Sequence, residues 1–154
     1  MPSKTVPIKT TTHQIGELSE SLEDYLEIIF QLQQERHMAR VKEIAAAKKV
    51  KMSSVTSALR RLNRLGLIEY EAREIARLSK TGESLAQRLW KRHHFLTDFL
   101  IDVLKLDRPT ADKDACAMEH ALSQKTMTRL SDFAEYLQTS KNGAGELIRK
   151  FRPR

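Results

Sequence analysis

The chain of 154 residues contains one cysteine, five glycines and four prolines, and it has no long hydrophobic run. A single cysteine excludes an internal disulfide, so the fold does not depend on an oxidising compartment. No stretch of about 18 apolar residues is present, and the first residues lack the apolar segment of a signal peptide. These absences predict a soluble, cytoplasmic protein with no membrane partner.

Basic residues outnumber acidic ones, with 27 Lys and Arg against 20 Asp and Glu, which gives a formal net charge of +7. This excess favours a polyanionic partner, although nucleic acid, a membrane surface and an acidic protein all fit it. The length allows one ordinary domain or two small ones, which excludes a long multidomain enzyme.

The spacing of apolar residues predicts a mainly α fold. After a mobile N-terminal arm, residues 1–18, a first helix is expected from about Ser19, and its buried face comprises Leu22, Tyr25, Leu26, Ile29 and Leu32. Further helices are expected at about 41–48, 53–65, 81–104, 110–122 and 125–137, with strands at 67–71 and 75–79. The helix-turn-helix followed by two strands predicts a winged helix-turn-helix domain over residues 19–80. A helical domain, 81–138, and a flexible basic tail, 139–154, complete the chain. The apolar stripe Met127, Leu130, Phe133 and Leu137 predicts a buried face for the helix at 125–137.

The third predicted helix carries the evidence for DNA binding. Its apolar residues Val55, Ala58, Leu59 and Leu62 would face the core, which leaves small hydroxyl and basic side chains outside. Small hydroxyl residues allow close approach to base edges, and arginines reach phosphates or guanine. The candidate DNA-contacting residues are Lys51, Ser53, Ser54, Thr56, Ser57, Arg60, Arg61 and, at the wing tip, Arg73. A polar outer face is ordinary on any helix, so the prediction also depends on the wing and the net charge.

A second pattern suggests a metal site. Cys116, Glu119 and His120 occupy positions i, i+3 and i+4, which places a thiol, a carboxylate and an imidazole on one helix face. His93 falls in the apolar stripe of the long helix and should point inward, while Asp24 and Glu27 share a face of the first helix. Such a mixed set suits divalent Fe, Mn, Co, Ni or Zn.

Each of these residues also has a structural interpretation. Asp24 fits a capping box, Glu27 a surface position, Cys116 a small buried side chain and His93 a core histidine. A regulator of the MarR type, which senses a small molecule or an oxidant without metal, would share the winged fold. An enzyme is not expected, because Cys116 and His120 on one helix provide no oxyanion hole.

Several segments, distributed over residues 19–137, resemble the diphtheria toxin repressor (DtxR) family of metal-dependent transcriptional regulators. They are SLEDYLEII at 21–29, ARVKEIA at 39–45, SSVT at 53–56, LGLI at 65–68, Arg92-His93, and EHALS at 119–123. The length is similar to that of the short, manganese-responsive MntR branch, which lacks the SH3-like domain of longer iron-responsive members.

The resemblance implies a homodimer that binds a palindromic operator in double-stranded DNA, with residues 81–138 as the dimerisation and metal-sensing domain. It implies a repressor of metal uptake or homeostasis genes that is activated by Fe(II) or Mn(II). The positions that match its ligands are Asp24, Glu27, His93, Glu119 and His120. Cys116 departs from the MntR pattern, which has glutamate there, and follows the iron-responsive branch, so the resemblance moves the preferred ion toward Fe(II).

Overall fold

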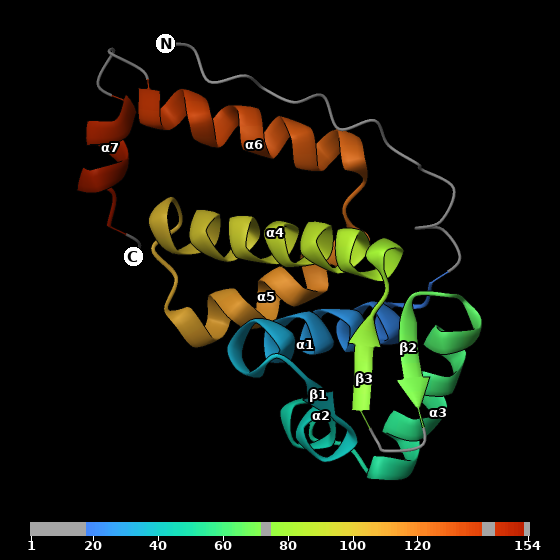
Figure 1. Ribbon diagram of the computed structural model, residues 1–154. Helices are drawn as coiled ribbons and strands as arrows, with labels where there is room; N and C mark the ends of the chain where they lie inside the picture. Colours follow the sequence, from blue (N-terminus) through green and yellow to red (C-terminus); the bar gives the residue numbers. More distant parts are fainter. Residues whose placement is uncertain (1–17, 72–74, 140–143, 153–154) are drawn as a thin grey trace.

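The computed structural model describes residues 18–71, 75–139 and 144–152, which form helices and one small sheet (Figure 1). The elements are α1 (Glu20–Arg36), β1 (Ala39–Arg40), α2 (Val41–Lys48), α3 (Met52–Arg64), β2 (Ile68–Glu71), β3 (Ile75–Leu78), α4 (Lys80–Asp102), α5 (Arg108–Ala121), α6 (Gln124–Thr139) and α7 (Ala144–Lys150). The mainly α fold class, with a winged helix-turn-helix domain followed by a helical domain, is confirmed. The predicted arm falls, apart from its last residue, outside the described residues.

The helix-turn-helix and the wing form as local sequence signals predict. Lys49 takes a left-handed conformation after α2, with φ of 58°, and Gly66 does the same after α3, with φ of 69°. A left-handed residue ends a helix, and glycine adopts it without steric cost. β3 lies between β1 and β2 and pairs with both in antiparallel register. β1 was not predicted, because two residues are too few to show an alternating pattern.

Helix α4 begins in close contact with the turn before the wing. The Ser79 hydroxyl accepts a hydrogen bond from the Gly82 amide at 3.0 Å and caps the helix. A Cβ atom added to Gly82 would lie 1.8 Å from the Leu67 carbonyl oxygen, so only glycine allows this approach. The first turn of α4 is therefore packed directly against the winged domain.

Two apolar clusters make up the core, and α4 contributes to both. Leu85, Ala86 and Leu89 belong to the cluster formed with α1, α2, α3 and the sheet. Leu96 and Leu100, further along α4, pack with α5 and α6. Figure 1 shows the winged domain beside the start of α4, while α6 runs alongside α4. The long helix thus joins the two domains through continuous packing.

The buried face predicted for α6 is only partly present. Met127 is buried and Leu130 is partly covered, but Phe133 is 48% exposed and Tyr136 is 56% exposed. The prediction that Phe133 is buried is wrong for a single chain, because this side chain is not among those that pack against the cluster of α4 and α5. Part of the predicted flexible tail, residues 144–150, is helical and forms α7.

Candidate metal centre

The six candidate ligands come from three helices that pack against one another. Asp24 and Glu27 lie on α1, His93 lies on α4, and α5 carries the remaining three, Cys116, Glu119 and His120. Helix α4 packs against both α1 and α5, which brings positions far apart in the sequence to one place. All six predicted residues are brought together.

The ligand atoms form two overlapping groups. Asp24, Cys116, Glu119 and His120 place one donor atom each within 4.8 Å of one another, and Glu27, His93 and Glu119 do the same. Glu119 belongs to both groups, and its side chain is only 2% exposed. We call these six residues the ligand cluster. A carboxylate has two oxygens, so Glu119 can serve both groups at once.

Short contacts between histidines and carboxylates hold the ligand cluster together. His120 Nε2 lies 3.2 Å from Asp24 Oδ1 and 3.5 Å from Glu119 Oε1. His93 Nδ1 lies 3.2 Å from Glu119 Oε2. The imidazole nitrogens and the carboxylate oxygens of three helices therefore converge on a shared volume.

Crowded negative charge perturbs the acids of this region. Burial, reinforced by the neighbouring Glu119 carboxylate, raises the pKa of Glu27 from 4.5 to about 7. The pKa of Cys116 is raised to about 11 by burial and by the charges of Asp24 and Glu119. The thiol is therefore protonated at neutral pH in the metal-free protein, and a metal ion that binds it must displace a proton.

The pKa values of the two histidines are raised as well, which for a histidine favours the charged form. The pKa of His93 is raised by its contact with the Glu119 carboxylate, which outweighs burial. Burial lowers the pKa of His120, but the hydrogen bond to Glu23 and the charge of Glu119 outweigh it, and the pKa is raised overall. In the metal-free protein, protons on the histidines thus compensate part of the carboxylate charge.

The residues fit a divalent metal ion. Among the described residues, three buried atoms of the second group have no hydrogen-bond partner: Glu27 Oε1, His93 Nδ1 and Glu119 Oε2. The last two are 3.2 Å apart, but their geometry does not make a hydrogen bond. Buried polar atoms without partners are costly, and a cation satisfies them. The carboxylate, imidazole and thiol donors match the ligand types of first-row transition metals.

Two supporting residues were missed by the sequence reasoning. Glu23 Oε2 lies 2.8 Å from His120 Nδ1, which leaves Nε2 directed at the ligand cluster. Arg92 Nη2 donates to the carbonyl oxygens of Glu119 and Leu122, at 2.6 and 2.9 Å, and so fixes the end of α5. Glu23 is adjacent to Asp24 and has no spacing signal of its own, so only the fold could identify it.

The candidate DNA-contacting residues lie where a winged helix would present them. Lys51, Ser53, Ser54, Ser57, Arg60 and Arg61 are exposed on or just before α3, and Thr56 is partly exposed. Val55, Leu59 and Leu62 are buried beneath them, as predicted, whereas Ala58 is only partly buried. Arg73 falls outside the described residues. The sequence reasoning did not consider Met52, which is 53% exposed at the start of α3.

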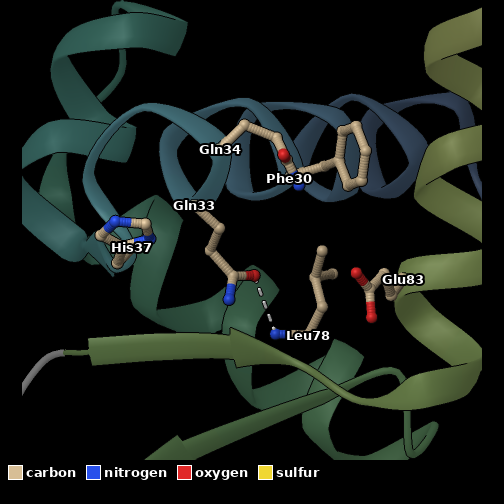
Figure 2. Close-up of a pocket in the computed structure, with 6 residues that line it drawn as sticks. All are labelled: Phe30, Gln33, Gln34, His37, Leu78 and Glu83. Carbon is tan, nitrogen blue, oxygen red and sulfur yellow. Dashed lines mark hydrogen bonds between the residues drawn. The ribbon is translucent and has the colours of Figure 1, made fainter.

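A small pocket lies apart from the ligand cluster and shares no residue with it. It has a volume of about 200 Å³ and is lined by Phe30, Gln33, Gln34, His37, Leu78 and Glu83 (Figure 2). Gln33 Oε1 accepts a hydrogen bond from the Leu78 amide at 3.0 Å, which ties α1 to β3.

Across residues 18–71, 75–139 and 144–152, no helix is long and apolar enough to cross a membrane.

Comparison with protein families gives two matches that together cover most of the chain. Residues 17–76 match the family described as "Iron dependent repressor, N-terminal DNA binding domain". Residues 79–147 match the family described as "Iron dependent repressor, metal binding and dimerisation domain". The first match ends within β3, and the second begins at Ser79, directly before α4.

Individual relatives agree with these matches. An HTH-type transcriptional regulator of Methanocaldococcus jannaschii is 36% identical over 77% of this chain and 95% of its own length. The regulator MntR of Shouchella clausii is 34% identical over 82% of this chain and 88% of its own length.

Two solved structures are similar in fold. IdeR of T. acidophilum is 26% identical with a TM-score of 0.66, and covers 73% of this chain. The manganese regulator SloR is 28% identical with a TM-score of 0.67, and covers 75% of this chain. The chain spans about half the length of these two structures, 53% and 54% respectively.

Proposed function

Because the chain belongs to the iron-dependent repressor family of metal-dependent transcriptional regulators, we propose that it represses its target genes when Fe(II) or Mn(II) occupies the ligand cluster. One observation carries this proposal: ligands from α1, α4 and α5 converge, and three of their buried atoms lack hydrogen-bond partners among the described residues. A divalent cation supplies the positive charge that neutralises these carboxylates.

The coupling between metal and DNA follows from where the ligands lie. Asp24 and Glu27 belong to α1, inside the winged domain, whereas Cys116, Glu119 and His120 belong to the helical domain. Without a cation, the clustered carboxylates repel one another across this boundary. Neutralisation favours one arrangement of α1 against α5, and therefore one position of α3.

The DNA surface is formed by α3 and the residue that precedes it. We propose that Ser53, Ser54, Thr56 and Ser57 approach base edges, and that Lys51, Arg60 and Arg61 contact phosphates or guanine, with Arg73 reaching DNA from the wing. The net charge of +7 supports a polyanionic partner.

A homodimer on a palindromic operator is the expected assembly. The second matched family is described as a dimerisation domain, and α6 carries the exposed Phe133 and Tyr136. Burial of such aromatic side chains against a second chain would remove them from water. Two α3 helices related by a twofold axis would then bind two half-sites.

The choice between iron and manganese depends on Cys116. Carboxylates favour the harder Mn(II), whereas a thiolate favours softer ions, so we propose that Cys116 moves the preference toward Fe(II). The alternative, a MarR-like regulator that senses an organic ligand or an oxidant, receives no support from the family matches, one of which is described as metal binding.

DNA binding measured under anaerobic conditions tests the proposal. A promoter fragment is titrated with the protein in chelator and then with graded Fe(II), Mn(II) or Zn(II), all at one salt concentration. A steep rise in affinity with one ion is expected. Equal affinity in chelator and with every ion would contradict the proposal and favour the MarR-like alternative.

A further inference from the structure

A lysine of the helix-turn-helix contacts the ligand cluster directly. Lys48 is the last residue of α2, and its Nζ lies 2.5 Å from Asp24 Oδ2. The same ammonium lies over the Tyr25 ring, 5.0 Å from its centroid, and the Lys48 side chain is only 18% exposed. Lys48 is therefore held in place and is not a freely moving surface lysine.

The two oxygens of Asp24 face different partners. Oδ1 lies 3.2 Å from His120 Nε2, on the side of the ligand cluster, while Oδ2 contacts Lys48. Asp24 can therefore donate Oδ1 to a cation while Oδ2 remains paired with Lys48. Any cation that binds Asp24 then shares one carboxylate with an ammonium group.

We propose that Lys48 is a built-in counter-cation that lowers the metal affinity of the ligand cluster and so sets the metal concentration at which this regulator responds. The inference rests on the proposed function, because it assumes that Asp24 is a metal ligand. In the metal-free protein, the ammonium neutralises Asp24 and ties α2 to α1. When a metal ion binds to Asp24, the ammonium group of Lys48 repels it.

Simple electrostatics gives the expected size of the effect. The repulsion between a single and a double positive charge about 5 Å apart in water lowers a binding constant roughly tenfold, and partial burial increases it. Loss of the lysine also removes a group that orients Asp24, which acts in the opposite direction. We expect the repulsion to be the larger of the two effects. Without Lys48, Asp24 is still positioned by its helix α1, and its partly exposed side chain can still turn toward the cation.

Mn(II) binding to the full chain tests the inference at pH 7, by competition with a fluorescent chelator at fixed ionic strength. Lys48→Met removes the charge and keeps the apolar stem, and Lys48→Gln is a second neutral variant. Lys48→Arg retains the charge. Lys42→Met is the matched control, since Lys42 is exposed on the same helix and its loss changes the net charge equally.

Both neutral variants are expected to bind Mn(II) about tenfold more tightly than the wild type, while Lys48→Arg and Lys42→Met stay within about twofold of it. The rise in the unfolding midpoint at a fixed Mn(II) concentration should be larger for the neutral variants, because tighter binding stabilises the folded state more. If both neutral variants bind Mn(II) no more tightly than the wild type, or if Lys42→Met tightens binding equally, the inference is overturned and the proposed function is not affected. A wild type that binds neither Mn(II) nor Fe(II) overturns the proposed function and this inference with it.

Discussion

Replacement of Glu27 by glutamine is expected to stabilise the metal-free protein at alkaline pH and to weaken its metal binding. Glu27 is partly buried near Glu119, Asp24 and the histidines, with its Oε1 atom fully buried, and its pKa is raised from 4.5 to about 7. Glutamine has nearly the same shape and never carries the charge. The substitution therefore isolates the cost of holding an ionised carboxylate in the ligand cluster.

The magnitude follows from the difference between the folded and unfolded pKa. Because the folded value lies above the unfolded one, Glu27 contributes stability that is present below pH 4.5 and is lost as the pH rises through about 7. The difference of about 2.5 pH units, at about 1.4 kcal/mol each, corresponds to about 3 kcal/mol. His93 and His120, whose pKa values are also raised, lose stabilisation in the same direction. They remain in both proteins, so the comparison with the wild type isolates Glu27 to first order.

Urea unfolding of the chelated proteins between pH 4.5 and pH 8 measures the effect. At pH 8 the Glu27→Gln variant should be up to about 3 kcal/mol more stable than the wild type, and near pH 4.5 the two should coincide. Added Mn(II) should stabilise the wild type more than the variant. Glu35→Gln is the control, because Glu35 is exposed on the same helix and should change stability by less than about 0.5 kcal/mol. Equal stability of wild type and Glu27→Gln at pH 8 would refute the reasoning.

Four further predictions concern the metal, the DNA and the dimer. Combined replacement of Glu119 and His120 by alanine should abolish metal-dependent DNA binding in gel-shift assays, while circular dichroism shows an unchanged helical content; a retained response to metal would argue against the ligand cluster. Cys116→Glu should shift the ratio of Fe(II) to Mn(II) affinity toward Mn(II), and an unchanged ratio would mean that the thiol does not select the ion. Arg61→Ala should weaken DNA binding and reduce the slope of log affinity against log salt by about 0.9, which a salt titration measures; an unchanged slope would place Arg61 off the phosphates. Phe133→Glu should produce monomers in light scattering, and a dimer of wild-type stability would move the interface away from α6.

The sequence predicted the helices well because their signals are local. The spacing of Val55, Leu59 and Leu62 identified the buried face of α3, and Gly66 marked its end. Terminal residues of the helices shifted by one or two positions, as fraying ends do. The prediction failed for β1, which depends on pairing with β3, and for Phe133, whose exposure depends on which elements surround α6.

For the ligand cluster too, one part could be predicted from local spacing and the other part depended on the packing of the helices. Spacing alone placed Cys116, Glu119 and His120 on one face of a helix, since 3.6 residues per turn fixes that geometry. Asp24, Glu27 and His93 lie beside these residues only because α1 and α5 pack against α4. Local sequence spacing gives no information on that packing.

The sequence by itself determined the helices from α1 to α6, the basic surface of α3 and the type of ligand on each helix, because each depends on neighbours within a few turns of chain. Only the tertiary structure decided that Glu119 serves two groups, that Glu23 contacts His120, and that Lys48 reaches Asp24. These contacts join residues up to 97 positions apart. Their electrostatic effects depend on distance and burial, and both quantities exist only once the helices are packed.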